Sequence, residues 1–294
     1  MYRPIYIRCA TVLLVFATVQ PVCAQFDLQF TVNSSGFSAA QLAVLEDSLD
    51  TAEATWEKVV TGYQPGISLT GISINIQSGS AFADAQITGS TTQAGFRLTT
   101  SGRVRVNPAV IDAFASWDGT PGPVDPDPNF LGLNYIDDLL AHEIGHVLGI
   151  GTQWVSNNVY TSGTGQYTGQ HGVAAYQAEF DPNATFLPVE LAGSSGTQNT
   201  HWDQIMRSSS QEGNPADPWS LDPRLGITDP LGRDKALELM TGALDPDYGE
   251  PFMSRTTIQS LRDIGFAVVP EPATLSMSLG LSAAALLMRF RRRC

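Results

Sequence analysis

The stretch His142-Glu143-Ile144-Gly145-His146-Val147-Leu148-Gly149 is the most specific pattern in this chain of 294 residues. Two histidines four positions apart on a helix project from one face and can bind a single zinc ion. The pattern therefore predicts His142 and His146 as metal ligands and Gly149 as the turn that ends the helix. Glu143 is predicted to be a general base acting on a zinc-activated water. Together these residues favour a zinc metalloendopeptidase, a hydrolase of peptide bonds.

The third protein ligand is not part of this motif. A catalytic zinc site commonly has three protein ligands and one open position, and the motif supplies two. Thr152 stands where the common short pattern has a third histidine, and the chain has four histidines in all. His171 and His201 are therefore the remaining imidazole candidates. Glu179 and Glu190 are the carboxylate alternatives, and the residues by themselves leave the choice open.

The first 24 residues have the composition of a secretory signal peptide. Arg3 and Arg8 form a positive start, the segment 9–19 is largely apolar, and small residues surround Val22-Cys23-Ala24. Such a segment is removed by signal peptidase on export. We therefore expect cleavage before Gln25 and a folded domain outside the cell.

The other end of the chain predicts a transmembrane helix at 273–290. This segment is mostly apolar and is followed by a terminal arginine cluster at 291–293. At about 1.5 Å per residue it spans roughly 27 Å, enough for the hydrocarbon core of a bilayer. The arginines are expected to stay cytoplasmic, which places the preceding domain outside. Contact with the membrane is expected only through this helix.

Val269-Pro270-Glu271-Pro272 stands directly before the apolar segment. Pro-Glu-Pro, then a short apolar helix, then arginines resembles the PEP-CTERM sorting signal of Gram-negative bacteria, here residues 269–294. The resemblance implies processing by an exosortase-type enzyme. It also implies a transient inner-membrane anchor and delivery to the cell surface or extracellular matrix.

The part of the chain between these ends is strongly acidic. Six of the 16 Lys and Arg residues and one of the 29 Asp and Glu residues lie in the end segments, so a net charge of 10 − 28 = −18 remains. Such a surface argues against nucleic acid and anionic membranes as partners. It is compatible with bound Ca²⁺. All three cysteines also lie in the end segments, so the middle must fold without a disulfide, and residues 25–268 suffice for one domain.

Hydrophobic periodicity predicts an α+β fold with a mixed twisted sheet, a backing helix, an active-site helix and a loop-rich C-terminal part. The expected elements are a strand at 26–32, a helix from the cap Ser38 to about Val60, a strand at 67–76, a weak strand at 79–95, a strand at 96–106, the motif helix from Asn134 or Tyr135, loops through 152–236 and a last helix at 255–266.

Beyond the motif, several segments resemble the bacterial leishmanolysin-like metallopeptidases, a metzincin family. The similarity runs in order over about residues 26–266, which is nearly the whole predicted domain. The matching segments are 150–154, Tyr167-Thr168-Gly169, Ala174-Ala175-Tyr176, Val189-Glu190-Leu191, Thr200-His201-Trp202-Asp203, Glu238-Leu239-Met240-Thr241-Gly242, Ser254-Arg255-Thr256-Thr257 and Leu261-Arg262-Asp263-Ile264-Gly265-Phe266.

This resemblance implies one catalytic Zn²⁺ held by His142, His146 and His201, with Met240 as the Met-turn residue beneath them. It implies a metzincin-like domain with an N-terminal part at 25–151 and a C-terminal part at 152–268, and protein or peptide substrates. His171 is then interpreted as an ordinary loop histidine. The chain departs from the family at 203–237, which resembles an insertion at the rim of the cleft.

Two other hypotheses stay open. The sorting tail and the acidic surface also suit a non-catalytic surface or matrix adhesion module on a metalloprotease scaffold, although such a module has no need of Glu143. A gluzincin-like site would use Glu179 or Glu190 as its ligand and leave Met240 without a role. For a peptidase, an extended substrate is expected to pair with a sheet edge above the zinc, and the strand Phe96–Val106 is the candidate edge.

Overall fold

The computed structural model describes residues 26–116, 134–191, 193–203, 228–233, 235–242 and 251–270. The predicted signal peptide at 1–24 and the predicted membrane helix at 273–290 lie outside these ranges. So does most of the predicted insertion at 203–237. Among the described residues, no helix combines the length and the apolar composition needed to cross a membrane.

The main sheet has four strands, in the order β1-β3-β5-β4. Strands β1 and β5 run parallel to β3, and β4 runs antiparallel to β5, so the sheet is mixed. In β3 the side chains of Ile72, Ile74 and Ile76 are buried, and the intervening residues face the other side of the sheet. The strands are β1 (Asp27–Val32), β3 (Gly71–Ser78), β4 (Ala83–Gln93) and β5 (Phe96–Val106).

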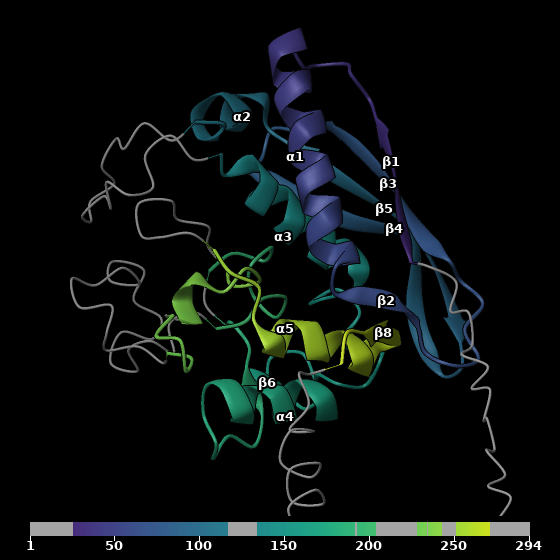
Figure 1. The fold of residues 1–294 in the computed structure, drawn as a ribbon, viewed down its shortest axis with the longest axis vertical. Helices are drawn as coiled ribbons and strands as arrows, with labels where there is room; N and C mark the ends of the chain where they lie inside the picture. The colour runs from purple at the N-terminus through teal and green to yellow at the C-terminus, as the bar shows by residue number, and fades with distance from the viewer. Residues whose placement is uncertain are drawn as a thin grey trace, which may run out of the picture.

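Two long helices pack on the apolar face of this sheet, α1 (Ala39–Glu57) and α3 (Ile136–Leu148) (Figure 1). The hydroxyl of Ser38 caps α1 in a capping box with Gln41. The indole Nε1 of Trp56 donates to the carbonyl of Ala141 at 2.8 Å and joins the two helices. A Cβ at Gly102 would lie 2.4 Å from a methyl group of Val147, so α3 lies closely against β5. Between β5 and α3 the chain forms α2 (Pro108–Phe114).

The C-terminal part is built mainly from short elements and loops around a buried aromatic cluster. The rings of Trp154 and Trp202 stack with centroids 4.4 Å apart, and Tyr167 meets both edge-on. Strand β8 pairs antiparallel with β2, which ties the end of the domain to its beginning. The elements are β2 (Val60–Tyr63), β6 (Gln166–Tyr167), α4 (Gln170–Glu179), β7 (Leu187–Pro188), the 3-10 helix η5 (Lys235–Leu237), α5 (Arg255–Ser260), the 3-10 helix η6 (Leu261–Ile264) and β8 (Phe266–Val268).

The predicted α+β class is confirmed, with several corrections to individual elements. Helix α1 ends at Glu57 and not near Val60, because Val60 begins the strand that pairs with β8. The last helix does not run to Phe266: α5 passes into η6, and Phe266 starts β8. The stretch at 152–236, expected to be loop-rich, also contains the helix α4. Local periodicity missed these features because partners far along the chain decide them.

The candidate substrate edge was assigned to the wrong strand. Strand β5 pairs with β4 along its length. On its other side 101–106 pairs with β3, and the backbone N–H and carbonyl of Arg97 bond to the side chain of Asn157, which leaves little free edge for another chain. The weakly patterned stretch at 79–95 contains the 11-residue strand β4, which is the outer strand on that side of the sheet. Its small polar residues give little hydrophobic alternation, so its sequence only weakly predicts a strand. Pairing with β5 stabilises the strand instead.

Candidate metal centre

The structure brings three of the four histidines together. His142 and His146 lie one turn apart on α3, and His201 comes from an irregular segment 55 positions after His146. Trp202, the residue after His201, forms bridges with Val189 on one side and Thr241 on the other. The segment with Trp202 thus lies between two other segments of the same chain and is bridged to both. These bridges hold His201 opposite α3.

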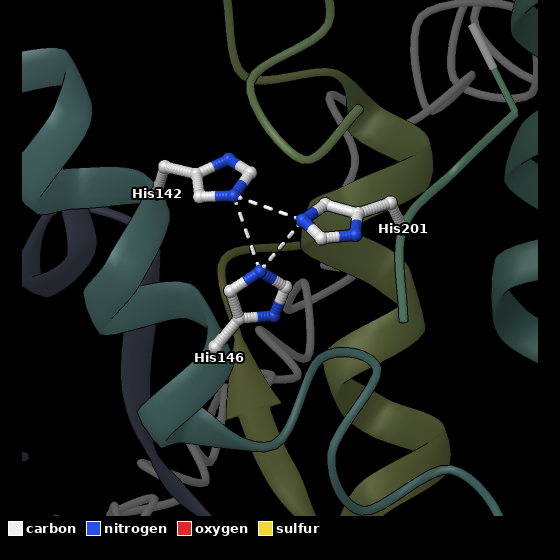
Figure 2. Close-up of side chains that lie close together, drawn as sticks. All are labelled: His142, His146 and His201. Atoms are coloured by element: carbon white, nitrogen blue, oxygen red, sulfur yellow. Dashed lines mark hydrogen bonds between the residues drawn. The ribbon is translucent and has the colours of Figure 1, made fainter. Parts of the chain in front are cut away.

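The three imidazoles point at a common centre (Figure 2). The Nε2 atoms of His142 and His201 are 3.1 Å apart, those of His146 and His142 are 3.1 Å apart, and those of His146 and His201 are 3.0 Å apart. Among the described residues, no other histidine, cysteine, aspartate or glutamate joins these three in the potential metal-ligand group.

Backbone carbonyls orient the rings from behind. The Nδ1 of His142 lies 2.6 Å from the carbonyl oxygen of Leu239, and that of His146 lies 2.9 Å from the carbonyl oxygen of Ile150. The Nδ1 of His201 lies 2.9 Å from the carbonyl oxygen of Thr197 and 3.0 Å from the hydroxyl of Thr200. A carbonyl only accepts hydrogen bonds, so each Nδ1 carries the proton and donates it.

This arrangement leaves three bare nitrogens facing each other. Burial lowers the pKa of His142 and, aided by the charges of His201 and His142, lowers that of His146 further. Burial also lowers the pKa of His201, to about 3. The rings are therefore neutral near pH 7, and their protons sit on Nδ1. Three lone pairs about 3 Å apart repel each other unless a cation lies between them.

The donor set fits zinc. Three neutral imidazoles with their outer nitrogens hydrogen-bonded to carbonyls are a common zinc-ligand arrangement. Zinc–nitrogen bonds of about 2.0–2.1 Å in a tetrahedral array separate the ligand nitrogens by roughly 3.3–3.4 Å. The observed separations of 3.0–3.1 Å need an expansion of only a few tenths of an ångström.

Glu143 lines the same cleft as the three histidines. The cleft measures about 740 Å³, and its lining also includes the start of β4 and the segment 194–197. Burial, reinforced by the charge of Asp84, raises the pKa of Glu143 to about 8. A cation held by the histidines would oppose that shift, because an opposite charge favours the carboxylate. Glu143 is thus positioned to exchange a proton with a molecule bound in the cleft.

Gly149 and Gly151 bring the chain around beneath the histidines. Gly149 ends α3 with φ of 121°, and Gly151 has φ of 74°, both in the region that favours glycine. A Cβ at Gly151 would lie 2.1 Å from the carbonyl oxygen of Thr200. Glycine is required there because the backbone passes directly against the residue that precedes His201.

Substitution of Gly151 by Ala is expected to destabilise the protein by at least about 2 kcal/mol. The positive φ costs about 1–2 kcal/mol for a residue with a Cβ, and the clash with Thr200 adds an overpacking term of similar size. Chemical denaturation measures the difference. Gly163→Ala is the control, since Gly163 has φ of 82° and nothing within 4 Å of its Cβ position. An equal decrease in the free energy of unfolding of the two variants would show that the contact between Gly151 and Thr200 does not affect stability.

Met240 lies under the motif helix. It is fully buried, and a Cβ at Gly145 would lie 2.5 Å from its sulfur, so the thioether packs against α3 one residue before His146. The carbonyl of Leu239, the preceding residue, is the acceptor for His142. The predicted Met-turn residue is therefore close to the three histidines and is not among their ligand atoms.

The alternative ligands are not part of the metal-ligand group, although the backbone N–H of Glu190 donates to the carbonyl of His201 at 3.0 Å. His171 is on the first turn of α4 rather than in a loop, and its backbone N–H donates to Asp263. Glu179 accepts from the backbone N–H groups of Arg255 and Thr256 and so caps α5. Neither Glu179 nor Glu190 belongs to the metal-ligand group. These positions weigh against a gluzincin-like site.

The carbonyl acceptors and the wall at 194–197 were not predicted. A carbonyl of Leu239, Ile150 or Thr197 has no signature in the sequence, because every residue carries one. A second acidic group of Asp27, Glu53 and Glu57 has oxygens within 4.8 Å of one another, but exposed clusters of this kind are common without an ion. Bound calcium therefore stays a prediction from composition alone.

Searches of family models, of curated proteins and of solved structures found no match to this chain, so the chemistry of the site rests on its own geometry.

Proposed function

We propose that this chain is an exported zinc metalloendopeptidase of the leishmanolysin-like, metzincin type. The observation that carries the proposal is the triangle of Nε2 atoms of His142, His146 and His201, 3.0–3.1 Å apart, in one cleft with Glu143. A pure binding module has no need of a buried carboxylate beside a metal site. The signal peptide, the sorting signal with its exosortase-type processing and the surface location stay predictions from the sequence.

The residues of the cleft have distinct tasks in this proposal. His142, His146 and His201 would hold the zinc ion in the cleft. When bound, zinc supplies Lewis-acid chemistry: it makes water acidic near pH 7 and polarises the scissile carbonyl. Glu143 takes the proton from the attacking water and then passes it to the leaving amine. Met240 forms the apolar floor beneath the rings.

Metal content and proteolysis of the purified full chain test the proposal together. We expect about one zinc per chain by atomic absorption, and casein hydrolysis that stops when a zinc chelator is added and returns when zinc is restored. Zinc binding without hydrolysis of casein, gelatin or a peptide library would favour the adhesion hypothesis. Absence of zinc would contradict the metal centre.

Strand β4 is the proposed edge for an extended substrate. The first three residues of this strand, 83–85, and the two residues before it line the cleft together with the histidines. Backbone N–H and C=O groups on the open side of β4 can pair with a peptide laid across the site. The cleft volume of about 740 Å³ lies in the usual range of ligand sites.

Binding of a peptide hydroxamate is expected to slow amide hydrogen exchange in 83–86. The reason is that β-augmentation gives the outer amides of β4 new hydrogen-bond partners. Strand β1, the outer strand at the far side of the sheet, is the internal control and should keep its exchange rates. Mass spectrometry of peptic fragments measures both. Equal protection of β1 and β4, or none at β4, would rule out this mode of binding.

A further inference from the structure

A buried carboxylate, Glu238, accepts four hydrogen bonds close to the metal centre. Glu238 is 2 % exposed and lies between the Met240 turn and the start of α5. Its Oε2 accepts the backbone N–H of Met240 at 2.7 Å. Its Oε1 accepts the backbone N–H of Ser254 at 3.1 Å, the hydroxyl of Ser254 at 2.8 Å and the hydroxyl of Thr257.

The turn held by Oε2 contacts the site at two points. The carbonyl of Leu239 accepts the Nδ1 proton of His142 at 2.6 Å and sets the orientation of that ring. The carbonyl of Met240 accepts the backbone N–H of Trp202 at 3.0 Å, directly after His201. A shift of this turn would therefore move the acceptor of one histidine and the support of another.

The groups held by Oε1 reach His201 by a second route. The hydroxyl of Thr257 donates to Glu238 and accepts the indole N–H of Trp202 at 2.8 Å. Trp202 is 1 % exposed and stacks on Trp154, so its position is tightly defined. Both oxygens of one side chain are thus connected to the backbone that presents His201.

We propose that Glu238 is a positioning residue of the metal centre, whose carboxylate fixes the Met240 turn and Trp202 and thereby aims His142 and His201 at one ion. The proposal rests on the zinc site proposed above. Outer hydrogen-bond partners of this kind restrict ring orientation, and their loss typically weakens metal binding by 10–100-fold.

Four donors converge on Glu238, which suits a carboxylate and no neutral replacement. Burial raises its pKa, and the hydrogen bonds from Thr257, Ser254 and Met240 oppose that shift by favouring the charged form. A glutamine at this position has the same shape but turns one acceptor into an NH₂ donor. That donor would face either the Met240 N–H or the donors of Ser254 and Thr257.

Glu179 supplies a matched control. It is 6 % exposed and also accepts hydrogen bonds at the start of α5, from the backbone N–H groups of Arg255 and Thr256 and from the Thr256 hydroxyl. These partners, Arg255 and Thr256, lie outside the Met240 turn, and neither hydrogen-bonds to a histidine of the centre. Glu179→Gln therefore removes a comparable buried acceptor without touching the proposed link.

The experiment measures zinc affinity of the full-length wild type, Glu238→Gln and Glu179→Gln by competition with a chromophoric chelator. We expect Glu238→Gln to bind zinc about 10–100-fold more weakly and Glu179→Gln to stay within about threefold of wild type. Unfolding midpoints in chelator should fall in both variants, since both lose buried hydrogen bonds. Cobalt-substituted Glu238→Gln should show shifted visible bands, and cobalt-substituted Glu179→Gln should not.

Three other results would contradict the role of Glu238 or the metal centre. Wild-type zinc affinity and cobalt bands in folded Glu238→Gln would overturn the role of Glu238 and leave the proposed peptidase intact. Equal loss of affinity in both variants would show a general effect of destabilisation and would also overturn it. Wild-type protein that binds no zinc would overturn the metal centre itself. Thr257→Val, which breaks only the route through Trp202, is expected to weaken zinc binding less than Glu238→Gln.

Discussion

Substitution of Glu143 by Gln is expected to lower kcat for peptide hydrolysis by about 10²–10⁴-fold, the usual contribution of a general acid–base group. Glutamine preserves the shape of the side chain but cannot take up a proton from water. The three histidines are unchanged, so zinc should still bind. Turnover of a fluorogenic peptide library and zinc content by atomic absorption measure the two effects separately.

Glu179→Gln is the control for this variant, because it makes the same chemical change in another buried glutamate that lies outside the cleft. At a temperature where it is still folded, this variant should have the same kcat as wild type. If Glu143→Gln retains wild-type turnover, Glu143 is not the base. If the variant loses zinc along with activity, its role is to support the metal rather than to move a proton.

Substitution of His201 by Ala is expected to weaken zinc binding by more than about 100-fold, since loss of an outer hydrogen-bond partner alone costs 10–100-fold. The substitution removes one corner of the Nε2 triangle and leaves two ligands on α3. Hydrolysis should be lost with the metal. Competition with a chelator measures the affinity, and circular dichroism checks that the fold survives.

His171→Ala is the matched control, because it removes a histidine on α4 that lies outside the metal-ligand group. It should bind zinc like wild type. Unchanged zinc affinity in His201→Ala would revive the carboxylate alternatives, and Glu179→Ala and Glu190→Ala would then separate them. A loss in His171→Ala equal to that in His201→Ala would show that zinc affinity follows stability rather than coordination.

Local sequence patterns located the parts of the site that lie on one helix. The spacing of His142 and His146 places both rings on one face of any α-helix, and the structure forms that helix at Ile136–Leu148. Gly149 was predicted to end it and has the positive φ expected of such a turn. Ser38, the predicted cap, likewise caps the helix that follows it. Such features depend on neighbours within a few residues, so the chain alone defines them.

The choice of His201 over His171 does not follow from spacing, and in the sequence it is implied only by the family resemblance. In the structure it follows from the pairing of Trp202 with Val189 and Thr241, which carries the preceding histidine to α3. Gly151 permits that approach only because its missing Cβ leaves room for the carbonyl of Thr200. No local pattern records such a contact, since it depends on segments that meet only after folding.

The proposed substrate edge is a second feature that the sequence pattern did not predict. Strand β5 has the stronger strand pattern because it is interior and buries Val104 and Val106, whereas β4 is outer and more polar. The strength of a strand pattern reports burial, but the ability to pair with a substrate requires an unpaired edge.

The sequence by itself therefore determined the motif helix, its two histidines, the glutamate between them and the glycine that ends it, because helical geometry fixes contacts between residues four positions apart. Only the tertiary structure decided how His201 and the Leu239 carbonyl reach that helix, how Glu238 meets the backbone N–H of Met240, and which strand borders the cleft. Most of these groups are far apart along the chain, and burial, close packing and hydrogen bonding across the fold bring them together.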